Sequence, residues 1–192
     1  MKALKIYVCL TCPIITLCLI FNILGITTFS YTGFAVDSCG IVFIGKDSII
    51  EKYFDGKKIA ELDPKTSRGY AFTIQNDNII LSTGSFVYTL DLDGKELGRE
   101  ADIETKVFNG LQKQKNFFVT NEGDQYYFKS ILGRAQVIDE SGNVLYKMPF
   151  LDYIVKLLFI SSLISIFVCV PLIIRATLTQ GTVSVKAKTG DV

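Results

Sequence analysis

The chain has 192 residues, of which 49% are apolar and 20% are charged, and its formal net charge is +1. It contains no histidine and no tryptophan, which removes the commonest general base, the Ser-His-Asp and Cys-His catalytic arrangements and most zinc sites. The length indicates one domain, and the apolar excess lies at the two ends.

Two uncharged segments predict membrane-spanning helices. Residues 6–29 form a run of 24 residues without a charge, and residues 157–174 form one of 18. About 20 apolar residues are needed to cross a bilayer as a helix. We therefore predict transmembrane helices over 6–29 and 153–175. The cytoplasmic N-terminus is then residues 1–5; the cytoplasmic tail, residues 176–192, is too short and polar to fold alone.

A cleaved signal peptide over residues 1–35 is the alternative to the first helix. The small-residue sequence "GFA" before Val36 is an acceptable cleavage site. The apolar run is longer than the roughly 7–15 residues of a signal-peptide core, which favours an uncleaved anchor.

The distribution of charge predicts the orientation. The ends have one acid, Asp191, against the flanking bases Lys2, Lys5, Arg175, Lys186 and Lys188. Residues 31–152 have 14 Lys+Arg against 18 Asp+Glu, a net charge of −4. Because basic flanks stay in the cytoplasm, both termini are expected inside the cell membrane and the central domain outside. An acidic central domain has no nucleic-acid footprint.

The cysteines do not form a disulfide framework. Cys39 is the single cysteine of the central region, while Cys9 and Cys12 have C-x-x-C spacing within an apolar run and are interpreted as packing. We predict no cofactor and no metal ligand. The lack of disulfides and of N-x-S/T sequons favours a bacterial cell envelope.

Residues 40–148 consist of short runs rich in Ile, Val, Phe, Tyr and Thr, separated by turn sequences such as Asp-Gly and Ser-Gly. This pattern predicts antiparallel hairpins, and the expected all-β extracytoplasmic domain covers residues 30–152. The segment "ADIETKVFNGLQKQK", residues 101–115, is the one candidate for a short helix or a long loop.

Three segments repeat one pattern: "EKYFDGKKIAEL", "VYTLDLDGKELG" and "AQVIDESGNVLY". Their turn glycines, Gly56, Gly94 and Gly142, are 38 and 48 residues apart, and the insert at 101–115 accounts for the longer spacing. A period near 40 built from strands predicts about three four-stranded blades.

These repeats resemble β-propeller blades of the YVTN or NHL-like kind, whose outer hairpins carry similar Asp-x-x-Gly-Lys-x-Leu turns. The resemblance covers the central region and implies a blade fold. Propellers typically close rings of about four to eight blades, so three blades leave open edges. Either the domain curls into a compact meander, or a partner covers the edges, or two copies complete one ring.

The carboxylates at Asp91, Asp93 and Glu96 raise the question of a calcium loop. A calcium loop ends in a bidentate glutamate, and Glu96 follows Asp91 too closely in the sequence to serve as that ligand. The corresponding turns of the other two repeats keep the glycine but not these carboxylates. We therefore predict a hairpin turn. Asp139 and Glu140 form a similar pair, which we also assign to a turn rather than to acid–base catalysis.

Aromatic residues alternate on neighbouring predicted strands, at Tyr70, Phe72, Phe86, Tyr88, Phe117, Phe118, Tyr126, Tyr127 and Phe128. Packing in the core is favoured for these aromatic side chains. Any of them that remain exposed could instead bind a sugar or a peptide. In the second apolar run, Ser161, Ser165 and Cys169 share one helical face that permits close helix contact.

No catalytic, cofactor-binding or metal residue is predicted, and the binding residues are unknown. The favoured hypothesis is a non-catalytic accessory or scaffold subunit of a membrane complex, bound to the lipid bilayer and to a membrane-protein partner or a second copy. The alternative is a module that binds or senses an envelope peptide or polysaccharide. A histidine-free carboxylate hydrolase using Asp91 and Asp93 is the third.

Overall fold

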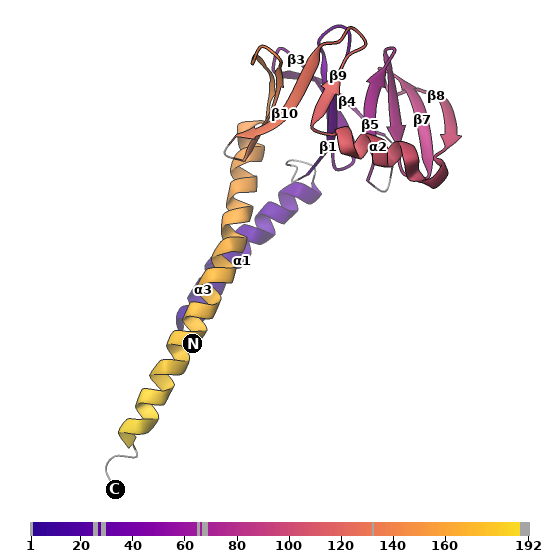
Figure 1. Ribbon diagram of the computed structural model, residues 1–192. Helices are drawn as coiled ribbons and strands as arrows, with labels where there is room; N and C mark the ends of the chain where they lie inside the picture. Colours follow the sequence, from indigo (N-terminus) through magenta and orange to yellow (C-terminus); the bar gives the residue numbers. More distant parts are fainter. Residues whose placement is uncertain are drawn as a thin grey trace. The chain divides into compact units, whose positions relative to one another are not determined.

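The computed structural model describes residues 2–24, 27, 30–64, 66, 69–131 and 133–188. The chain divides into two compact units (Figure 1). One unit combines Met1–Thr27 with Phe150–Val192, and the other is Thr28–Pro149. We call them the helical unit and the β-domain.

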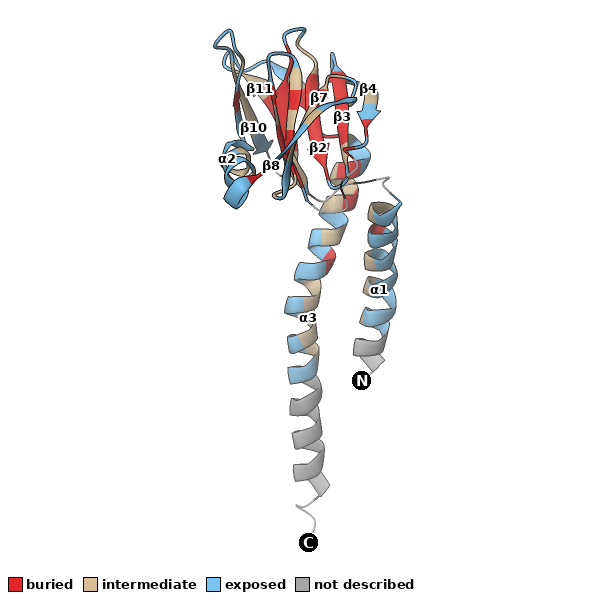
Figure 2. Ribbon diagram, turned by 90° about the vertical axis from the view of Figure 1, so that its right-hand side faces the viewer, coloured by how far each residue is buried: buried red, intermediate tan, exposed pale blue. Residues whose placement is uncertain are grey.

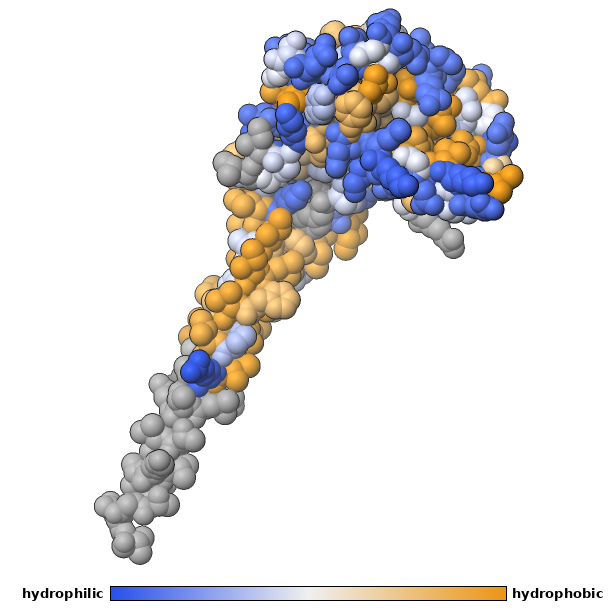
Figure 3. Space-filling view, viewed as in Figure 1, coloured by the Kyte–Doolittle hydropathy of each residue, from blue (hydrophilic) through white to orange (hydrophobic). Residues whose placement is uncertain are grey.

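The helical unit contains two helices, α1 (Lys2–Ile23) and α3 (Phe150–Lys188). Both are long and apolar enough to cross a membrane, over Ile6–Ile23 and Phe150–Arg175. Their surfaces are mostly apolar and exposed (Figures 2 and 3), as expected of side chains that face lipid. The two predicted apolar helices are therefore present.

The ends of these helices differ from the predicted ones. α1 ends at Ile23, before the expected residue 29, and the Asn22 side chain donates to the Thr27 carbonyl oxygen over 3.2 Å. This bond satisfies a backbone acceptor beyond the helix end. α3 begins at Phe150 instead of residue 153 and continues to Lys188. Most of the predicted tail, residues 176–192, is thus a continuation of the helix.

Polar and small residues join the two helices. The Tyr7 hydroxyl lies 2.7 Å from Ser165 Oγ. Ser165 and Cys169 are half-buried, as the predicted face requires, but Ser161 is exposed and the buried small residue is its neighbour Ser162. Ser165 and Cys169 are therefore covered as predicted, and Ser162 takes the place that was expected for Ser161.

The described strands of the β-domain form three four-stranded antiparallel sheets. The first blade contains β1 (Tyr31–Val36), β2 (Val42–Lys46), β3 (Ile49–Phe54) and β4 (Lys57–Leu62). The second contains β5 (Ala71–Gln75), β6 (Asn78–Ser82), β7 (Phe86–Asp91) and β8 (Glu96–Ala101). The third contains β9 (Phe117–Val119), β10 (Gln125–Ile131), β11 (Arg134–Asp139) and β12 (Val144–Lys147).

Each sheet is a simple meander in chain order, which is the strand order of a propeller blade. The predicted propeller-like repeats are therefore confirmed, and each quoted repeat is the outer hairpin of one blade. The turn glycines Gly56, Gly94 and Gly142 have φ of 70°, 86° and 88°. Glycine adopts this region without the steric cost of a Cβ, which explains why it persists in all three turns.

A register shift recurs at the same place in each outer hairpin. It falls between Lys52 and Tyr53, between Thr89 and Leu90, and between Val137 and Ile138. A bulge of this kind adds one residue to the outermost strand and increases the local twist.

The first blade supplies most of the core. All five residues of β2 are buried, whereas in the second blade β7 is mostly half-buried and β8 is largely exposed (Figure 2). Phe34 of β1 packs on Phe118 and Phe128 of the third blade, with ring centroids 6.3 and 5.9 Å apart. The strand β2 of the first blade thus has both faces covered, whereas the outer strand β4 is mostly exposed.

The insert between the second and third blades is a short 3-10 turn, Ile103–Thr105, followed by α2 (Lys106–Gln114). Asp102 holds its start, because its carboxylate accepts the backbone N–H groups of Val107 and Phe108 over 3.0 and 2.9 Å. The same carboxylate accepts the Ser82 hydroxyl of β6 over 2.7 Å. Of the two predicted alternatives for residues 101–115, the short helix is correct.

Candidate functional site

A pocket of about 320 Å³ is lined by residues of the inner strands β5 and β9 and of the end of α2. We call it the central pocket, because all three blades contribute to its wall. Four phenylalanines line it: Phe34 from β1, Phe72 from β5, and Phe117 and Phe118 from β9. Thr73, Gln75, Asn76, Gln114, Lys115 and Asn121 also line it, so polar groups contribute more of its wall than is usual for a small-molecule site.

The inner hairpin turns join the blades beside this pocket. The Ser38 hydroxyl of the first blade donates to Asp77 Oδ1 of the second over 2.9 Å. The Asn121 side chain of the third blade donates to Asn76 Oδ1 of the second over 3.1 Å. These contacts link the second blade to the first and to the third.

Several polar side chains of the pocket have no partner. Thr73, Gln75 and Gln114 make no side-chain hydrogen bond to any residue that the structure describes. Lys115 is the one charged residue among the described lining residues, and it forms no ion pair with them. The pocket therefore offers neutral donors and acceptors and one cation to a ligand.

Part of the backbone along the pocket is paired with none of the strands that the structure describes. Asn76 and Asp77 have φ of 50° and 55°, which is the type I′ geometry of a two-residue hairpin closed by Gln75 and Asn78. Along an antiparallel strand, the backbone N–H and C=O groups of successive residues point alternately toward and away from the neighbouring strand. Because Gln75 is paired with Asn78 on β6, the backbone groups of Ile74 and Phe72 point away from β6. Both faces of β5 line the pocket, which places it along this free edge.

The edge of β9 is free in the same way. Phe128 N–H donates to Asn116 O and Thr120 N–H donates to Asp124 O, both over 3.0 Å. Those bonds face β10, and the alternation along the strand then directs the backbone groups of Phe117 and Val119 away from it. Two free strand edges therefore line the central pocket.

The predicted aromatic residues separate into two groups. Core packing is correct for Tyr70, Phe72 and Phe118, which are buried. Phe117 is 40% exposed and lies 5.2 Å from the Tyr127 ring, on the face of the third blade that is opposite its core. The sequence could not separate these groups, because alternation assigns faces without saying which face is covered.

The carboxylates considered for chemistry serve turns. Asp91 Oδ1 accepts the backbone N–H groups of Asp93 and Lys95 over 3.0 and 2.8 Å. Asp93 Oδ1 lies 3.1 Å from Lys52 Nζ and thereby links the second blade to the first. The predicted hairpin turn at this position is confirmed by the register of β7 and β8.

Asp139 has the corresponding role in the third blade. Its carboxylate accepts the side-chain and backbone N–H groups of Asn143, each over 2.8 Å. These bonds, led by that from the Asn143 side chain, hold the pKa of Asp139 below its ordinary value of 3.8. Thr120 has a similar role in the turn before β10, and sequence reasoning missed one more such turn, at Asp37, although a glycine follows it three residues later.

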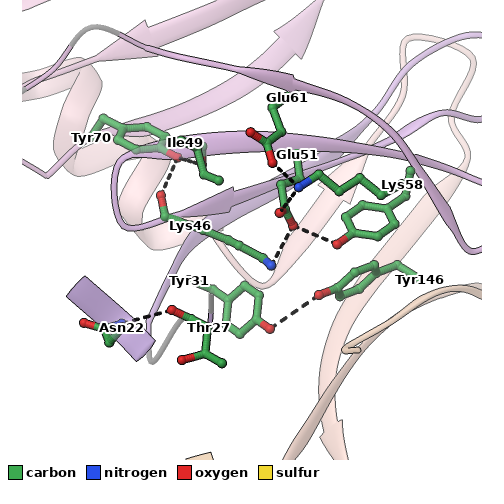
Figure 4. Close-up of polar contacts among 11 residues, drawn as sticks. Asn22, Thr27, Tyr31, Lys46, Ile49, Glu51, Lys58, Glu61, Tyr70 and Tyr146 are labelled. Atoms are coloured by element: carbon green, nitrogen blue, oxygen red, sulfur yellow. Dashed lines mark hydrogen bonds and ion pairs between the residues drawn. The ribbon is translucent and has the colours of Figure 1, made fainter. Parts of the chain in front are cut away.

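A buried ionic cluster lies within the first blade (Figure 4). Glu51 on β3 contacts Lys46 Nζ at 2.6 Å and Lys58 Nζ at 2.7 Å, and accepts the Tyr53 hydroxyl over 2.7 Å. Burial by itself raises the pKa of Glu51, but these hydrogen bonds outweigh it and hold the pKa below 4.5. Both carboxylate oxygens are occupied, so we interpret the cluster as a structural part of the blade.

No family model and no curated protein matches the chain. Solved structures with some similarity include a catalytically inactive virginiamycin B lyase from Staphylococcus aureus with quinupristin, at 15% identity and TM-score 0.34. This match covers 64% of the chain and 42% of the lyase. A protein of unknown function from Bacteroides caccae has 14% identity and TM-score 0.31, covering 62% and 45%.

The Neurospora crassa Pan2 WD40 domain has 15% identity and TM-score 0.32, covering 62% of the chain and 38% of that domain. The chain thus spans less than half the length of these structures. Its own topology defines the class: a protein of three propeller-like β-repeats with two apolar helices that are long enough to cross a membrane.

Proposed function

We propose that the protein is a non-catalytic β-repeat domain anchored in the cell membrane, where it acts as an accessory or scaffold subunit of a membrane complex. In this proposal both termini are cytoplasmic and the β-domain is extracytoplasmic. The basic residues at the chain ends and the acidic balance of residues 31–152 support this orientation.

The uncovered face of the third blade carries this proposal. Phe117, Val119 and Val144 are 40%, 45% and 52% exposed, and the strand register places Tyr127 and Ile138 between them. Contiguous apolar side chains on a soluble surface usually mark an interaction site. A second protein that packs against this face would remove them from water.

The test is the native mass of the full-length protein after gentle extraction from its own membrane. We expect a stoichiometric second subunit, either foreign or a second copy. A stable monomer without a partner would contradict the proposal. The matched comparison is Val144→Thr, which keeps the strand propensity of the site but lowers its hydrophobicity and is expected to weaken the assembly.

A second candidate function is the binding or sensing of an envelope peptide or polysaccharide. The central pocket supports it, because Phe34, Phe72 and Phe117 and the unpaired amides of Gln75 and Gln114 suit either ligand. Thermal unfolding of the full-length protein with soluble wall glycans and with peptides tests this function. No stabilisation by either class would count against it.

A further inference from the structure

We propose that the central pocket binds a short extended polypeptide segment with an acidic side chain, supplied by the partner, which adds as a strand to the free edges of β5 and β9. This inference deepens the proposed function, on which it rests, by assigning the partner's point of attachment. Nothing in the chain itself pairs with these edges among the described strands.

The free backbone groups favour a polypeptide over a sugar. Phe72 and Ile74 on one side, and Phe117 and Val119 on the other, present N–H and C=O groups at the spacing of a β-ladder. An extended peptide matches alternating donors and acceptors of this kind, and strand addition to a free edge is a common mode of peptide recognition. A polysaccharide has no such ladder.

The side chains around the edges supply selectivity. In strand addition the main chain provides affinity and pockets for alternate side chains provide specificity. Phe34, Phe72 and Phe118 supply apolar surface to the wall, and Gln114 and Lys115 supply polar groups. Because Lys115 has no anionic partner within the described chain, an Asp or Glu side chain or a terminal carboxylate on the segment complements it.

Helix α2 fixes the position of this cation. Leu111, Gln114 and Lys115 all line the pocket, and Asp102 ties the start of the helix to Ser82 on β6. The insert between the second and third blades is thus part of the binding site. Phe108 of α2 lies beside Gly84 of the turn after β6, so the helix contacts the second blade there as well.

The experiment uses the full-length protein in detergent and a displayed library of random octapeptides. We expect enrichment of sequences that combine β-branched residues with an acidic one. Synthetic peptides from the enriched set are then measured against four variants: Val119→Pro, Val119→Ala, Lys115→Gln and Lys113→Gln.

Val119→Pro removes a backbone N–H that faces the pocket and takes no bond from the β9–β10 ladder, and proline is tolerated at such an edge. We expect Val119→Pro to bind at least about tenfold more weakly than Val119→Ala, which loses the side chain but keeps the N–H. Lys115→Gln should weaken acidic peptides, while Lys113→Gln, whose site lies outside the pocket, should leave their affinity unchanged. Thermal unfolding of each variant checks that it is folded.

Three results would overturn the inference: no enriched peptide, equal binding by the proline and alanine variants, or wall glycans that compete for the pocket. The native mass separates this inference from the proposed function. If a co-purified subunit stays bound to the Val119→Pro variant, the scaffold function is supported but the central pocket is not where that subunit attaches. Peptide binding by a protein that is monomeric in its membrane extract supports the pocket and contradicts the subunit role.

Discussion

Lys46 Nζ lies 2.6 Å from Glu51 Oε2, and both side chains are almost fully buried on neighbouring strands of the first blade. Lys58 occupies the other carboxylate oxygen of Glu51 and also contacts Glu61. Glu51 thus contacts the buried Lys46, and it also contacts the half-exposed Lys58, which has Glu61 as a second acidic partner. The first blade tolerates these charges between its covered faces because each has a partner.

Glu51→Gln should destabilise the β-domain by about 3 kcal/mol, because it removes the carboxylate charge that lies 2.6 Å from the buried Lys46. Unfolding of the full-length protein by denaturant measures the change. The matched control is Glu61→Gln, which removes an exposed partner of Lys58 and should cost less than about 1 kcal/mol. Equal effects of the two substitutions would contradict a structural role for the buried pair.

The same carboxylate predicts a loss of stability in acid. The folded pKa of Glu51 lies below its ordinary value of 4.5, so its contribution is complete above that pH and disappears as the pH falls through the folded pKa. We expect the unfolding midpoint of the wild type to drop below about pH 4 more steeply than that of Glu51→Gln. Parallel curves for the two proteins would show that other groups dominate.

Gly45→Ala should destabilise the protein by about 2 kcal/mol, because there is no room for a methyl group. A Cβ at this position of β2 would meet Thr32 Oγ1 directly and would lie 2.7 Å from Phe72 Cε1. Gly98→Ala on β8 is the control, since nothing lies within 4 Å of its Cβ. Its effect should stay within about 0.5 kcal/mol in the same unfolding measurement.

Asp102→Ala should loosen α2. The carboxylate accepts two backbone N–H groups at the start of the helix and the hydroxyl of Ser82, so its loss frees three donors. Amide hydrogen exchange across Lys106–Gln114 is expected to accelerate, whereas Glu104→Gln in the same insert should leave it unchanged. Unaltered exchange in the alanine variant would mean that packing alone holds the helix.

Chemical labelling of Cys39 tests on which side of the membrane the β-domain lies. Its side chain is exposed in the β-domain, whereas Cys9, Cys12, Cys18 and Cys169 belong to the apolar helices. A membrane-impermeant maleimide should therefore label intact cells through Cys39, and Cys39→Ser should abolish the labelling. Labelling that requires cell lysis would place the domain inside.

The blades could be predicted because their signals are local. A glycine at a fixed place in "DGKK", "DGKE" and "SGNV" marks each outer hairpin, and the alternating residues on either side mark its strands. The helix boundaries were less accurate, since α1 ends at Ile23 although the uncharged run continues to residue 29. The last carbonyl groups of a helix need partners outside its own hydrogen-bond pattern, and a count of apolar residues does not record them.

The central pocket could not be predicted. Phe34, Phe72 and Phe117 come from three different blades, and their meeting depends on contacts between turns, such as that of Asn121 with Asn76. Neither asparagine differs in sequence from an ordinary turn residue. The free edges of β5 and β9 likewise become visible only when the order of all strands is known.

The recurrent bulge of the outer hairpins has a consequence for crowding. A protein held on a surface meets its neighbours at a far higher local concentration than one in solution. Regular outer strands of adjacent copies would then join edge to edge into continuous sheets. The displaced register at Lys52, Thr89 and Val137 bends each outer strand away from such pairing. Many copies can therefore share one membrane and remain separate, with the inner edges kept for a chosen partner.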